Sequence, residues 1–123
     1  GQALSAFVAT MALALLLVAG LVVDGGAKVS ATRRVHAAAA VAARAAVDAG
    51  AVARAAGAPV EVGALQQAAS RTLSERGVEG SVAVEAGRVR VSAHTSTPTV
   101  FLSLIGITEL EASGEAVAEL RTP

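Results

Sequence analysis

Few side chains in this sequence could carry out chemistry. The chain has two histidines, His36 and His94, and no cysteine, so it can form neither a disulfide nor a thiolate metal site. Neither histidine has a carboxylate beside it at the spacing of metal ligands. We therefore expect both histidines at the surface, and we expect no metal and no cofactor.

Other common functional sites also lack their signatures. Gly25-Gly26 follows an apolar run instead of a strand and lacks the lysine and serine of a phosphate-binding loop. No serine stands in a nucleophile-elbow context. Tyrosine and tryptophan are absent, so the arginines have few aromatic partners on which a base could stack. We expect a protein that is not an enzyme and that does not bind nucleic acid.

The chain instead begins with an apolar element. Residues 3–23 contain no charge and no proline. A helix over this run is about 31 Å long, which matches the hydrocarbon thickness of a bilayer. The run includes Ser5 and Thr10, whose hydroxyls can bond to the helix backbone. It predicts a membrane-spanning helix that either stays in lipid or enters the dry core of a protein assembly.

Composition allows one small domain besides this helix. Hydrophobic residues make up 54% of the chain and aromatic residues 2%, so the core must be thin and built mainly from alanine and valine. Residues 24–57 carry five basic and two acidic side chains, whereas residues 58–123 carry five arginines and eight glutamates. The basic stretch indicates either the cytoplasmic side of a membrane or a solvated face that meets an acidic neighbour.

Residues 27–56 predict a helical stem, because alanine is the best helix former and no proline interrupts it. Gly25-Gly26 precedes the stem, and each glycine weakens a helix by about 1 kcal/mol relative to alanine. We expect a kink or hinge there, with a plain loop between two helices as the alternative.

One side of the stem repeats small side chains in steps of four and three. This seam consists of Val35, Ala39, Ala42, Ala46, Ala49, Ala53 and Ala56. Methyl groups allow a partner helix to approach closely, so we expect helix–helix assembly there. The alternative is that the seam packs on the second half of the same chain.

The rest of the chain predicts a small α+β head. Gly57-Ala58-Pro59 ends the stem, and residues 62–76 predict an amphipathic helix. Residues 81–85 and 88–94 alternate with period two around a short turn and predict a hairpin. A last antiparallel strand is expected over residues 108–120.

Two further expectations concern the head. The glutamates of the last strand could pair with Arg88 and Arg90 across the sheet. Residues 98–105 predict a short apolar helix that either fills the core of the head or touches a neighbouring subunit or the membrane surface. The chain therefore divides into an apolar helix (1–24), a stem (25–57) and the head (58–123).

Three stretches resemble a known family. Residues 1–7 (GQALSAF), residues 20–26 (GLVVDGG) and residues 97–107 (TPTVFLSLIGI) are similar to segments of TadE/TadG-like proteins of Flp (Tad) pilus systems. The resemblance implies a type IV pilin-like subunit, inserted in the bacterial inner membrane by its apolar helix. It also implies two partners, a prepilin peptidase and the pilus assembly machinery. Nine arginines against one lysine, with abundant alanine, indicate a GC-rich genome such as that of an actinobacterium.

Processing is expected at Gly1 and Gln2, because the sequence begins at Gly1 without a methionine or a basic leader. In the pilin superfamily a glycine precedes the cut and a glutamate follows five residues after it. Gly1 matches either that glycine or the first residue retained, but positions 5 and 6 are Ser5 and Ala6. This departure leaves open an anchored protein that is not cleaved.

We thus expect a structural protein that self-associates into an extracellular filament after leaving membrane lipid. The apolar side chains expected at the contacts between helices are Phe7, Leu13, Leu16 and Leu17, together with the seam. One alternative is a membrane-anchored minor pseudopilin or assembly factor that never polymerises. Another is a membrane-tethered binding module of the cell envelope, whose acidic sheet holds a cationic partner.

Overall fold

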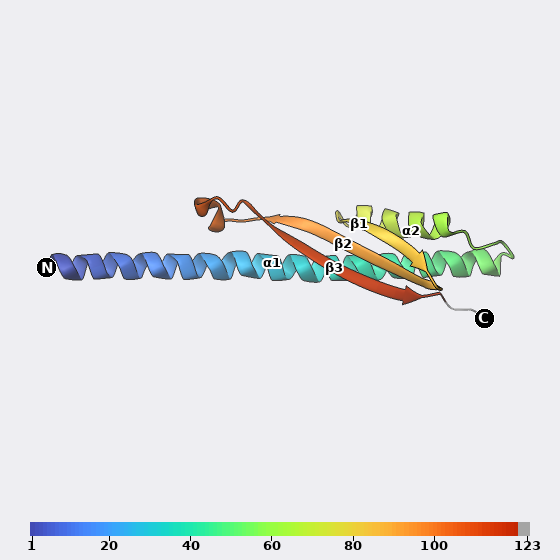
Figure 1. Cartoon of the computed structure of the whole chain (residues 1–123), viewed down its shortest axis with the longest axis horizontal. Helices are drawn as coiled ribbons and strands as arrows, with labels where there is room; N and C mark the ends of the chain where they lie inside the picture. Colours follow the sequence, from blue (N-terminus) through green and yellow to red (C-terminus); the bar gives the residue numbers. More distant parts are fainter. Residues whose placement is uncertain (121–123) are drawn as a thin grey trace.

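The computed structural model describes residues 1–120 and shows a long helix with a small sheet along one half (Figure 1). The helices are α1 (Gln2–Ala55) and α2 (Val62–Glu75). The strands are β1 (Glu79–Glu85), β2 (Arg88–Pro98) and β3 (Glu109–Glu119). A 3-10 helix, η1 (Leu102–Ile105), lies between β2 and β3. The predicted α+β class is confirmed.

Helix α1 has 54 residues and runs straight through Gly25 and Gly26 (Figure 1). The expected kink is therefore absent from this helix, and so is the alternative loop. Two glycines cost about 2 kcal/mol of helix stability, which packing offsets: contacts with the rest of the chain hold α1 before the pair, at Gly20, and after it, at Ala31. Bending at Gly25-Gly26 during assembly stays a prediction.

The stem ends where the sequence predicts. Gly57 adopts a left-handed conformation with φ of +74°, which glycine tolerates best, and Pro59 follows it. The chain then turns back, and α2 packs beside α1 while burying Leu65, Ala69 and Leu73. Helix α2 contacts both the stem and β1.

The sheet is an antiparallel meander in the order β1-β2-β3. Ala86 and Gly87 form the turn between β1 and β2, both with positive φ, as a two-residue hairpin turn requires. Alternation places Val89 and Val91 on the buried face, against the helices. The predicted pairs form on the outer face, with Arg88 to Glu119 at 3.6 Å and Arg90 to Glu115 at 3.4 Å. Exposed pairs of this kind add at most a fraction of a kcal/mol.

The core lies between the second half of α1 and the sheet. A single stripe of buried α1 residues faces the rest of the chain. Gly20 and Asp24 lie under the β2–β3 connection, and the others lie under the sheet and α2: Ala31, Val35, Ala38, Ala39, Ala42, Ala43, Ala46 and Gly50. The seam thus packs mainly within its own chain, because Val35, Ala39, Ala42 and Ala46 have no exposed surface left. The expectation that these four residues meet a partner helix is wrong in this structure.

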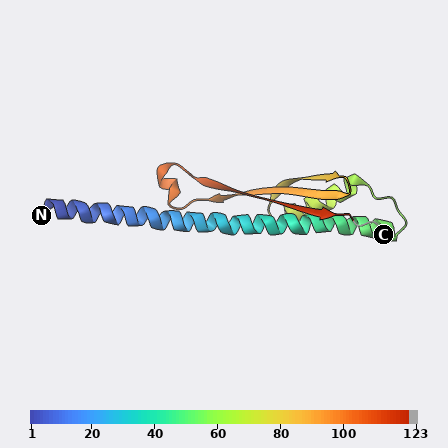
Figure 2. The same ribbon diagram turned by 60° about the horizontal axis from the view of Figure 1, so that its bottom comes forward.

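The first half of α1 extends beyond the head with little covering it, as two views show (Figures 1 and 2). All buried hydrophobic residues described in residues 1–120 come from Ala31 onward. A long apolar amino-terminal helix followed by a small antiparallel sheet packed on its second half is a pilin-like architecture.

Candidate membrane and assembly surface

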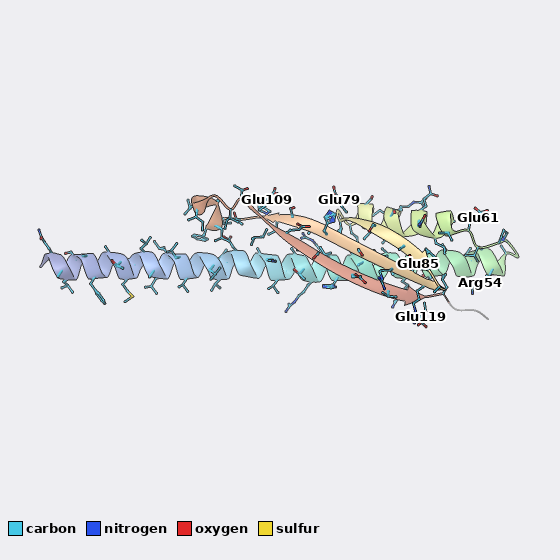
Figure 3. All side chains as sticks on the ribbon, viewed as in Figure 1. Arg54, Glu61, Glu79, Glu85, Glu109 and Glu119 are labelled. Carbon is cyan, nitrogen blue, oxygen red and sulfur yellow. The ribbon has the colours of Figure 1, made fainter. Side chains whose placement is uncertain are left out.

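The first surface of interest is the projecting part of α1. Residues 2–19 are all exposed, and their side chains project from both the upper and the lower side of the helix in Figure 3. Leu16, in the middle of this segment, is 60% exposed. The helix is long and apolar enough to cross a membrane. An exposed apolar surface of this extent needs lipid or other apolar helices around it.

The two hydroxyls in this segment suit an apolar environment. Thr10 donates from Oγ1 to the carbonyl of Ala6 at 2.8 Å, and Ser5 donates to the carbonyl of Gly1 at 3.3 Å. Each hydroxyl is therefore satisfied within the helix, as the hydrocarbon region of a bilayer requires.

The second feature is a carboxylate at the end of the apolar run. Asp24 is 1% exposed and accepts three backbone hydrogen bonds from one loop. The amides of Val100, Phe101 and Leu102 donate to it at 2.8, 3.2 and 2.7 Å. The Val100 bond does most to lower the pKa of Asp24 below its ordinary value of 3.8; desolvation opposes it, and the bonds from Leu102 and Phe101 lower the pKa further. Asp24 thus fastens the β2–β3 connection to α1 as a carboxylate.

The third feature is that connection, residues 99–107, which we call the apolar loop. Phe101 lies over Gly20, where an added Cβ would come within 2.5 Å of the Phe101 Cβ. Of the other large apolar side chains of the loop, Leu102 is half-buried, whereas Val100, Leu104, Ile105 and Ile107 are exposed. The expectation that this segment fills the core of the head is therefore wrong. It lies along α1 beyond the end of the sheet (Figure 1).

The structure separates the residues predicted to act in assembly into two groups. Phe7, Leu13, Leu16 and Leu17 are exposed on the projecting helix and free to meet neighbours. Most of the seam is buried within the chain, and Gly1 and Gln2 lie exposed at the far tip. Both histidines are exposed, as expected, and His94 lies 3.6 Å from Glu79.

Sequence reasoning missed the contact formed by Gly20, Asp24 and Phe101. One signal was present: an acid at the end of the apolar run, with a glycine one helical turn before it, repeats the spacing of a single helix face. The partner was not visible in the sequence, because Asp24 and Val100 are 76 positions apart.

Comparisons with known proteins add no family assignment: no family model matches the chain, and neither curated proteins nor solved structures give a match.

Proposed function

We propose that this chain is the structural subunit of an extracellular pilus-like filament, without enzymatic activity. The observation that carries the proposal is the bare first half of α1, which is apolar on all sides and extends past the head. Before assembly this segment would lie in the bacterial inner membrane. In the filament the same segment from neighbouring subunits would replace the lipid.

The exchange requires little change in the environment of the helix. Lipid tails are as apolar as leucine, so association of the helices depends on close packing and dispersion contacts. Phe7, Leu13, Leu16 and Leu17 would supply these contacts. A prepilin peptidase and a pilus assembly machinery would be the partners that process and extract the chain.

Charge on the second half of the molecule supports association between the stem of one subunit and the head of the next. Lys28, Arg33 and Arg34 are exposed on α1. The outer face of β3 presents Glu109 and Glu111 to solvent. The basic face of one subunit could therefore meet the acidic face of the next. Such charge complementarity would fix the orientation of neighbouring subunits and would add little to their affinity.

Cysteine cross-linking in the host cell tests the proposal, because the chain has no cysteine of its own. We expect Leu16→Cys to give cross-linked ladders in material sheared from the cell surface, since this position would face neighbouring helices. Val52→Cys is the control, because Val52 is also exposed and apolar but lies at the other end of α1. A chain that stays in the membrane fraction, without ladders from cysteines at Phe7, Leu13, Leu16 or Leu17, would contradict filament formation.

A membrane-anchored assembly factor that never polymerises is the second candidate. Ser5 and Ala6 favour it, because they occupy the positions where the pilin superfamily carries its glutamate. An anchored chain of this kind would not be cleaved by a prepilin peptidase and would stay in the membrane fraction. Mass spectrometry of the terminus and fractionation of sheared cells together distinguish the two candidates.

A further inference from the structure

The apolar loop exposes a compact set of large aliphatic side chains. Val100, Leu104, Ile105 and Ile107 all face solvent, and Leu104 is 83% exposed. Residues 99–107 contain no charged residue. Since a connection between two strands is normally polar, this exposure requires a separate explanation.

The loop lies at the level where the apolar helix ends. Asp24, the first charged residue after the run, holds its backbone, and Phe101 reaches back to Gly20. Gly20 lies four residues before Asp24, or about 6 Å along the helix axis at 1.5 Å per residue. This depth falls within the 5–10 Å or so to which interfacial elements enter a bilayer. The loop surface is therefore continuous with the membrane-spanning surface of α1.

Backbone hydrogen bonding also prepares the loop for a poorly hydrated environment. Three amides donate to Asp24, and the amide of Ile107 donates to the carbonyl of Leu102 at 3.1 Å. The amide of Thr99 donates to the carbonyl of Thr108 at 3.0 Å, which closes the loop at its base. These bonds reduce the number of backbone polar groups that would lose water without gaining a partner at a membrane interface.

We propose that the apolar loop is a second membrane contact, with its aliphatic side chains in the boundary between phospholipid headgroups and acyl chains. Lipid fits the surface better than another subunit does. A patch of four side chains is small compared with the roughly 800 Å² that each partner buries in a standard protein interface. The adjoining apolar helix, in contrast, already brings the patch to the bilayer. The contact would set the height and tilt of the head on the membrane. It depends on membrane insertion of α1 and is independent of polymerisation.

Depth-dependent quenching tests this contact on the full chain in phosphatidylcholine and phosphatidylglycerol vesicles. A single cysteine from Leu104→Cys carries an environment-sensitive fluorophore, and lipids bearing a nitroxide near the headgroup act as quenchers. Because Leu104 is almost fully exposed, the label replaces no packing contact within the chain. We expect several-fold stronger quenching at this position than for Val52→Cys, an exposed apolar position remote from the loop, and an approach to the level of Val22→Cys within the span.

Quenching at Leu104 equal to that at Val52 would overturn the proposal. A second result would also overturn it: the label is not quenched by the lipids, and its shielding from water increases with the protein-to-lipid ratio. That result would identify a second copy of the chain as the partner of the loop. Ile105→Cys provides an independent repeat. The vesicles contain no assembly machinery, so a failure of the filament proposal leaves the result of this experiment unchanged.

Discussion

At the scale of single residues, Asp24 connects the two halves of the molecule. Its carboxylate accepts hydrogen bonds from three successive loop residues, and this arrangement explains why an acid next to an apolar span is buried. A carboxylate satisfied by backbone amides is stabilised in its charged form. Gly20 has no side chain, and Phe101 occupies the space above it. The position of the loop therefore depends on the Asp24 carboxylate and on the glycine at position 20.

The lowered pKa of Asp24 predicts a pH-dependent loop. Since the pKa is lower in the folded chain than its ordinary value of 3.8, the contribution of Asp24 is complete above that value and is lost as the pH falls through the lower value in the folded chain. We expect the amides of Val100 and Leu102 to lose protection from hydrogen exchange over this acidic range, measured by NMR in micelles. Asp24→Asn should reduce protection at all pH values and remove the pH dependence. Unchanged protection in that variant would show that the loop is held by other contacts.

At the scale of elements, the stem and the sheet meet through small side chains. An added Cβ at Gly114 would come within 2.9 Å of the His36 ring, and Ala42 has no exposed surface. The sheet can therefore approach α1 closely, and a chain with only 2% aromatic residues can still have a well-packed core. The seam repeats with helical period because the sheet covers one face of a straight helix.

Overpacking this contact should destabilise the head. We expect Ala42→Leu to lower the free energy of unfolding by about 1–3 kcal/mol, because the extra atoms have no space between α1 and the sheet. Ala40→Leu is the matched control. Ala40 is exposed on the same helix, and leucine has a helix propensity close to that of alanine. Urea titration of the full chain in mild detergent, followed by circular dichroism, measures both. Equal unfolding curves for the two variants would mean that the seam is not a packed core contact in solution.

At the scale of the whole molecule, the chain has two parts that suit different environments: an apolar helix suited to lipid or to other apolar helices, and a head with its own core. The buried hydrophobic residues lie from Ala31 onward, whereas the projecting half of α1 leaves its leucines uncovered. The head therefore gains nothing for its own core from the apolar segment, apart from the contact at Gly20. This division allows one helix to serve as a membrane anchor and, in the proposed filament, as the packed axis.

A chain that begins at Asp24 should therefore stay folded and become soluble. We expect a monomer in size-exclusion chromatography with light scattering, and a circular dichroism spectrum that retains both helix and sheet. The expected reason is that truncation removes the surface that needs lipid or neighbours and leaves the core intact. Filaments formed by the truncated chain would contradict assembly through the apolar helix.

Local patterns in the sequence determined the elements of this protein. The uncharged run, the proline-free alanine stem, the glycine and proline after it, and the period-two strands each act over a few neighbouring residues, so helix α1, the hairpin and the Arg–Glu pairs could be predicted. Tertiary structure decided which surfaces meet. The seam had two suitable partners, a helix of another copy or the second half of its own chain, and small side chains fit both. The sheet and α2 of the same chain cover it, because they are covalently attached and always present at high effective concentration. The place of Asp24 depended on a contact between residues 76 positions apart, which no local pattern encodes.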